Sequence, residues 1–363
     1  MKRVILSVTS LLALSNTLYA LGTDAGTDIE NTATLTYSAG GVEQPSVTSN
    51  KDSFKVDKKI DMILSTDDST QVEVTPGQED RITNYSFKNE GNADQKFKFE
   101  VSNLANGEEA DYNDKKDSDD VKNLEIQCTY TDENGDSQTT NWESSFIIKI
   151  KEDTEASCKV RADIKSASEG GEDGDIMNVE LKATAYKDDE SGPEEETSEA
   201  DTQDKVDVVF ADGVADSTLG ESGGSKGDEA RDGKELARSG YIISTPILSV
   251  TKSSCPVSDP VNDTNNPKRI PGAIIRYMFD IKNDGSNDAS SIKLKDTLDD
   301  NLDLGNTKES AKKSENQDSC SCDSEPTTGI SDDTTVNGQD VEIQNINVQS
   351  NKHTCVSFEV EIK

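Results

Sequence analysis

Six cysteines are the residues of this sequence with the most evident chemistry. If the two halves of the chain fold separately, the first half can pair only Cys128 with Cys158, closing a loop of about 30 residues worth roughly 3.5 kcal/mol. A bond between Cys320 and Cys322 would be strained, because disulfides hold their Cα atoms about 5.5 Å apart. We therefore expect Cys255 and Cys355 each to pair with one of these two, in either combination. The full set is Cys128, Cys158, Cys255, Cys320, Cys322 and Cys355.

Zinc is the competing interpretation of the last cysteines. Cys320-Ser321-Cys322 and His353-Thr354-Cys355 together offer thiolate and imidazole ligands that zinc accepts. The spacing matches no known zinc motif, and an even number of cysteines in an oxidising compartment favours disulfides. The sequence therefore favours three disulfides over a metal centre.

His353 is the only histidine and so the only candidate for a nucleophilic relay. It directly precedes an alternating segment, where we expect the exposed end of a hairpin rather than a catalytic base. Among 73 acidic residues some close carboxylate pair is inevitable, so acidity alone does not indicate a glycosidase. Trp142 is the only tryptophan, and no aromatic platform for a sugar is evident. We predict that the chain is not an enzyme and has no cofactor, with calcium as the one alternative.

Calcium is suggested by one acidic loop. Asp132, Asn134, Asp136 and Glu143 occupy positions one, three, five and twelve of a calcium-binding loop, but Ser137 stands where such a loop needs glycine. Asn134-Gly135 is also a strong two-residue hairpin turn. The sequence favours a plain hairpin and leaves a weak calcium site as the alternative.

The charge of the chain excludes one class of partner. Its 363 residues carry 73 Asp and Glu against 37 Lys and Arg, for a net charge of -36. Such a surface repels phosphate, so we expect no nucleic-acid partner. Charge repulsion within the chain also predicts that salt or divalent cations stabilise the fold, as would suit a saline habitat.

Alternating apolar and polar residues predict the fold class. Hydrophobic residues make up only 31% of the chain, yet several segments place them at every second position, as half-buried strands do. Glycine-containing turns separate these segments, and no helical periodicity is convincing. We predict an all-β chain of antiparallel sheets. Examples are Phe97, Phe99, Val101 and Val356, Phe358, Val360, Ile362.

The first twenty residues have the pattern of a secretory signal peptide. Lys2 and Arg3 precede an apolar run of about eleven residues, and Ala20 is a small residue at the expected cut. The run is too short for a membrane span, and no second stretch reaches that length. We expect export to the periplasm, the cell surface or the extracellular space, with no membrane span after the signal is removed.

Composition divides the rest of the chain in two. Residues 213–240 hold seven glycines among acidic and serine residues, as a flexible linker would. We predict a signal peptide at 1–20, an N-terminal β-sandwich with extra leading strands at 22–210, a linker at 211–244 and a C-terminal sandwich at 245–363.

The two modules share a repeated unit. Pro76-Gly77 and then a strand ending in Asn89-Glu90-Gly91 correspond to Pro271-Gly272 and a strand ending in Asn283-Asp284-Gly285. Pro-Gly turns the chain into a strand, and we expect the final glycine to adopt a positive φ. A repeated module argues for an array of similar sandwiches.

This unit resembles a bacterial surface-protein repeat, the domain of unknown function eleven. The resemblance is strongest over 245–300 and weaker over 29–105. It implies immunoglobulin-like sandwiches exposed at the cell envelope, and it implies no catalytic residues.

The sequence thus predicts a non-enzymatic exported protein that acts as a structural or adhesive scaffold at the envelope. The alternative is a calcium-dependent carbohydrate- or protein-binding module. Expected partners are other envelope or surface proteins, including further copies of this chain joined by strand addition at exposed edges.

Overall fold

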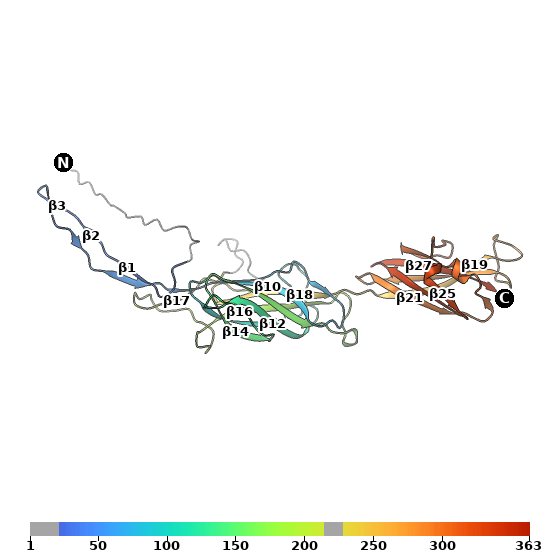
Figure 1. The fold of residues 1–363 in the computed structure, drawn as a ribbon, viewed down its shortest axis with the longest axis horizontal. Helices are drawn as coiled ribbons and strands as arrows, with labels where there is room; N and C mark the ends of the chain where they lie inside the picture. The colour runs from blue at the N-terminus through green and yellow to red at the C-terminus, as the bar shows by residue number, and fades with distance from the viewer. Residues whose placement is uncertain (1–21, 214–227) are drawn as a thin grey trace.

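A computed structural model describes residues 22–213 and 228–363, and Figure 1 shows them as two β-rich bodies in line with a narrow arm at the N-terminal end. The predicted signal peptide and the middle of the predicted linker lie outside these residues. Apart from three single-turn helices, the regular elements are strands, so the chain is all-β as predicted. Among the described residues, no helix is long and apolar enough to cross a membrane.

The first body is a sandwich of two five-stranded sheets. Neighbouring strands are antiparallel except where β9 joins β18 in parallel. The first sheet has the order β13 (Ser137–Thr139), β12 (Lys122–Thr131), β15 (Glu155–Asp163), β10 (Arg81–Asn89) and β8 (Met62–Thr66). The second has the order β14 (Ser145–Ile150), β11 (Gln95–Asn103), β16 (Ile176–Tyr186), β18 (Lys234–Ile243) and β9 (Val72–Val74).

The alternating residues meet between these sheets as the sequence predicts. Phe87 of β10 packs edge-on against Phe97 and Phe99 of β11, with ring centroids 4.8 and 5.0 Å apart. All three rings are buried. Edge-to-face contacts of this kind add to the free energy gained by burying the rings.

The second body is also built from two facing sheets. Its larger sheet has the order β19 (Leu248–Ser258), β20 (Ile274–Asn283), β27 (Lys352–Ile362), β23 (Lys312–Gln317) and β24 (Thr328–Gly329), with β22 (Leu302–Asp303) also paired to β27. The facing sheet has only three strands, β21 (Ala289–Thr297), β26 (Asp340–Val348) and β25 (Thr334–Asn337). Phe279, Phe358 and Ile343 are buried between them.

A buried asparagine links the sheets in both bodies at the end of the repeated unit. The Asn89 amide donates to the carbonyls of Ala93 and Ile150, and the Asn283 amide donates to those of Asn287 and Val348. Each asparagine oxygen accepts from the amide of the glycine two residues later. The repeat found in the sequence is therefore a repeat in structure.

The glycines that end the repeated unit do not adopt the positive φ that the sequence analysis expected. Close backbone approach requires them instead. A Cβ on Gly91 would lie 2.6 Å from the Lys59 carbonyl oxygen, and one on Gly285 would lie 2.1 Å from that of Thr245. In each body the chain entering the first strand crosses directly over this glycine.

The boundary between the bodies differs from the predicted linker at 211–244. Residues 234–243 form β18, which lies inside the second sheet between β16 and β9. Its buried residues include the small Ala237, Ser239 and Gly240 as well as Tyr241 and Ile243, so part of the segment has the composition of a linker although it is buried. Only residues 244–247 separate β18 from β19.

Asp173 of the first body holds this short connection in place. Its carboxylate accepts hydrogen bonds from the amide of Thr245 and from the amide and hydroxyl of Ser286. The two bodies are therefore joined by hydrogen bonds as well as by the chain.

A two-stranded arm, residues 28–55, extends from the far end of the first body (Figure 1). Its strands pair in three short ladders around a turn at Gly40 and Gly41. The ladders are β1 (Asp28–Asn31) with β6 (Asp52–Lys55), β2 (Thr34–Leu35) with β5 (Val47–Thr48), and β3 (Ser38–Ala39) with β4 (Val42–Glu43). At the base of the arm, β7 (Lys58–Ile60) pairs in parallel with β17 (Val208–Phe210).

Candidate functional site

The six cysteines form three disulfides. Cys128 of β12 is bonded to Cys158 of the neighbouring β15, and their side chains are buried in the first core. In the second body the bonds are Cys255–Cys322 and Cys320–Cys355, one of the two combinations that the sequence left open. No cysteine among the described residues is free, so the thiolates that a zinc site needs are absent there.

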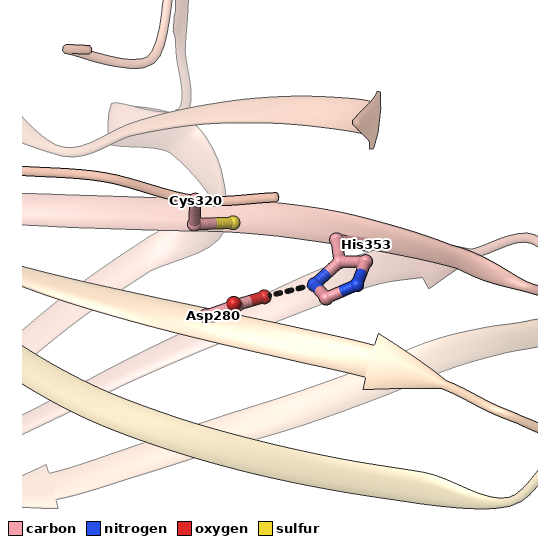
Figure 2. A group of neighbouring side chains, drawn as sticks. All are labelled: Asp280, Cys320 and His353. Carbon is pink, nitrogen blue, oxygen red and sulfur yellow. Dashed lines mark hydrogen bonds and ion pairs between the residues drawn. The ribbon is translucent and has the colours of Figure 1, made fainter. Parts of the chain in front are cut away.

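His353 lies beside an acidic partner that the sequence analysis missed. Its Nδ1 is 2.6 Å from Oδ1 of Asp280 on the adjacent strand β20, and Figure 2 shows the two side chains pointing toward each other. The ring is partly buried rather than an exposed hairpin end, because β27 begins one residue earlier and carries it into the sheet. Pairing between β20 and β27 is a long-range contact, so no local pattern identifies Asp280.

The chemistry open to this pair is limited. Cys320 Sγ lies within 4.8 Å of the Asp280 and His353 ligand atoms (Figure 2), but its bond to Cys355 removes it as a thiolate. Within the described chain, the ring forms no side-chain hydrogen bond other than that to Asp280. An Asp–His pair without a nucleophile can position a proton but cannot form a relay.

The predicted calcium loop does not gather its ligands. The Asp132 carboxylate accepts hydrogen bonds from the backbone amides of Asp136 and Asn134, both at 2.9 Å, and from the side-chain amide of Gln138. These hydrogen bonds hold the pKa of the Asp132 carboxyl below its usual value. Glu143 instead forms a β-bridge with Ile126. Ile126 precedes Asp132 by six residues along an extended strand, so Glu143 lies on the order of 20 Å from the turn. The carboxylates of Asp132, Asp136 and Glu143 are therefore not within 4.8 Å of one another. The hairpin interpretation describes this segment.

Three other carboxylates do come together at the base of the arm. Asp57, Asp201 and Asp207 place oxygens within 4.8 Å of one another. Asp57 Oδ1 also accepts the amide of Asp207, which helps to hold β17 beside β7. These residues are up to 150 positions apart in the sequence, so no motif marks them.

Arg161 lines a polar hollow on the first body and also contacts Trp142. The Arg161 guanidinium covers the Trp142 ring at 4.6 Å and pairs with Asp80 and Glu125. Asn123 and the amide of Asp80 donate to Asp163, which lowers the pKa of its carboxyl. The hollow has a volume of about 420 Å³, but Arg161 occupies one face of the only indole ring. A sugar would have to displace this cation to stack there.

Comparison with known proteins adds little to this geometry. No protein-family model matches the chain, and no curated protein matches it. It is similar to a chain of the chaperone–tip adhesin complex of CFA/I fimbriae biogenesis, with 10% identity, 84% of this chain and 94% of that chain covered, and a TM-score of 0.24. It is also similar to the CupB6 tip adhesin from Pseudomonas aeruginosa, with 8% identity, coverage of 84% and 88%, and a TM-score of 0.25. Scores this low carry no argument about the fold or the function of this chain.

Proposed function

We propose that this chain is an exported, non-enzymatic protein of the cell envelope that serves as a structural or adhesive element. The observation that carries the proposal is the construction of the molecule: two repeated β-sandwich bodies, stabilised by three disulfides and joined in line. Disulfides form and persist outside the reducing cytosol. The predicted signal peptide supports the same destination.

The outer surface supports a spacer or scaffold rather than a catalyst. Most of the acidic residues lie in loops and turns between the strands, and within the described chain no hydroxyl or thiol is hydrogen-bonded to His353 of the Asp280–His353 pair. The shared asparagine links support the resemblance to a repeat of surface proteins, because both bodies use one unit in the same way.

Calcium-dependent binding is the second function that the sequence raised, and the separation of Asp132 from Glu143 does not favour it. The two proposed functions predict different effects of calcium chelation on binding. Labelling of intact cells with a membrane-impermeant reagent tests surface exposure, and we expect this chain to be labelled without lysis. Binding to a glycan array with and without EDTA tests the calcium route. Loss of glycan binding on chelation would favour the second function, and labelling only after lysis would contradict a surface role.

A further inference from the structure

The two bodies can be compared residue by residue. Asn89 and Asn283 make the same hydrogen bonds, and they lie opposite Met62 of β8 and Leu248 of β19. Two residues further along, Leu64 lies opposite Phe87 and Val250 lies opposite Ile281. Strand β19 is therefore the counterpart of β8, and its apolar side chains point toward the same side of the sandwich.

These equivalent positions differ sharply in exposure. Met62 and Leu64 are 1% and 0% exposed, whereas Leu248 and Val250 are 44% and 58% exposed. Exposing two large apolar side chains on a long edge strand costs free energy and invites pairing with another strand. The second body thus exposes the apolar side chains of β19, whereas the first body buries the equivalent side chains of β8.

The difference in exposure arises because two strands of the first body, β16 and β18, have no counterpart within the described residues of the second body. In the first body, β11 pairs with β14 on one edge and with β16 on the other, β18 continues the sheet, and β18 packs against β8. In the second body, β21 pairs with β26 alone, and within residues 228–363 no strand pairs with its other edge. Phe97 and Phe99 of β11 are buried, while Ile292 and Leu294 of β21 are only partly buried. The second body lacks the counterpart of the antiparallel pair β16–β18.

The arm is an antiparallel pair of strands without a core. Leu35 and Val47 lie opposite each other and are 60% and 53% exposed, and Val42, opposite Ala39, is 65% exposed. An isolated two-stranded ribbon is marginally stable in water. The arm therefore has the features of an element that is completed by another surface.

The arm also matches the missing strands in pattern. In β16 the inward side chains are Val179, Leu181, Ala183 and Ala185, all buried. The first strand of the arm likewise has apolar residues at every second position, Ala33, Leu35, Tyr37 and Ala39.

Charge favours contact between these two surfaces over others. The chain has a net charge of -36, so most pairs of surfaces from two copies repel each other. Residues 31–50 of the arm contain one charged residue, Glu43, and residues 246–258 around β19 contain one of opposite sign, Lys252.

We propose that the arm of one copy completes the second body of another copy, adding its two strands beside β21 and covering Leu248 and Val250 of β19. Figure 1 places the arm and the second body at opposite ends of the molecule, so the contact joins different copies. A heterologous contact of this kind repeats from copy to copy and builds a linear chain.

Sedimentation of the purified chain without its signal peptide tests this proposal. One variant changes the arm, Leu35→Asp with Val47→Asp, and another changes the edge, Leu248→Asp with Val250→Asp. A matched control, Val261→Asp, changes a side chain that is 78% exposed and outside both surfaces. We expect wild type and control to increase in mass with concentration, and each variant to associate at least tenfold more weakly. At a concentration where all the chains are monomeric, the variants should melt at the same temperature as wild type.

Mixing the two variants gives the sharpest result. The arm variant keeps an intact second body and the edge variant keeps an intact arm, so the mixture forms one-to-one dimers that cannot grow further. A wild-type chain that stays monomeric at high concentration, an edge variant that associates like wild type, or a mixture that stays monomeric would each overturn the proposal. The experiment uses purified protein, so its failure leaves the proposed location and function untouched.

Discussion

Gly285 shows how a single residue fixes the entry to the second body. A methyl group there would meet the carbonyl oxygen of Thr245 at 2.1 Å and the amide nitrogen of Ile247 at 2.4 Å. Both are backbone atoms, so they cannot move aside as a flexible side chain could. We predict that Gly285→Ala destabilises the protein by about 1–3 kcal/mol, as overpacking does.

Urea unfolding measures this effect, and Gly329→Ala is the matched control. Gly329 also lies in a strand of the second body, but nothing is within 4 Å of its added Cβ. Equal losses of stability in the two variants would contradict the close approach.

Asp117 predicts a dependence of stability on pH. Burial, with a smaller contribution from nearby Asp120, Asp119 and Glu108, raises the pKa of its carboxyl to about 6, although a hydrogen bond from the backbone amide of Asn178 opposes the shift. The folded state therefore holds this proton more tightly than the unfolded state, whose value is 3.8. The stabilisation is complete below that value and is lost as the pH rises through about 6.

Replacing Asp117 by Asn removes this titration while keeping the oxygen that accepts from Asn178. Relative to the variant, we expect wild type to lose roughly 1–3 kcal/mol of unfolding free energy between pH 4 and pH 7. Urea unfolding across this range measures the difference, with the exposed Asp300→Asn as control. Parallel curves for wild type and Asp117→Asn would show that burial does not shift this group.

Residue types and local spacing predicted the disulfides and the hairpin, but they could not predict contacts between residues on strands that are distant in the sequence. Cysteine number and compartment pointed to disulfides, and the Asn134-Gly135 turn pointed to a hairpin. Asp280 beside His353, and Asp57 beside Asp207, depend on pairing between distant strands. The calcium spacing was misleading because a hairpin moves Glu143 away from the turn, whereas a loop followed by a helix would return it.

At the scale of elements, the bond between Cys128 and Cys158 joins adjacent strands of the first sheet. We predict that replacing both cysteines by alanine lowers the unfolding free energy by about 3–4 kcal/mol, because the unfolded chain loses a crosslink across about 30 residues. Thermal unfolding of the variant measures this loss. Alkylation of the wild-type protein without prior reduction, followed by mass spectrometry, tests whether the three disulfides form. Free thiols in the exported protein would contradict them.

Strands that bury large residues at every second position were predictable, and β18, whose middle residues are small, was not. β10, β20 and β27 bury large side chains at every second position, so the pattern is visible in the sequence. β18 buries the small Ala237, Ser239 and Gly240 beside Tyr241 and Ile243, and a Cβ on Gly240 would lie 2.7 Å from the Met177 carbonyl oxygen. Composition alone therefore placed this central strand in a linker.

The stability of the whole molecule is expected to increase with salt concentration, because its many negative charges repel one another. At 0.01 M salt, charges about 30 Å apart still repel, and at 0.15 M the range falls to about 8 Å. For a net charge of -36, we predict that the melting temperature rises by several degrees from 10 mM to 500 mM NaCl. Calcium and magnesium chloride at equal ionic strength should act alike if no calcium site exists. A melting temperature that does not change with either salt would contradict this expectation.

The two bodies also show what the sequence could reveal about assembly. The repeated unit predicted two related sandwiches, and exposed edges suggested strand addition. Only the register of β8 and β19 against their neighbours shows that one sandwich is complete and the other is not. Exposure of Leu248 and Val250 depends on strands that are far away in the sequence or absent from that body, so no local pattern predicts it.

Hydrogen exchange of the wild-type chain, compared below and above the concentration at which it associates, tests the completion of the second body most directly. If an arm from another copy adds beside β21, amides of β21 that have no partner in the single chain become protected on association, together with amides of residues 31–39 in the arm. The same amides remain unprotected in the arm variant at every concentration. Association without protection of β21 and the arm, or protection confined to other strands, would contradict the account.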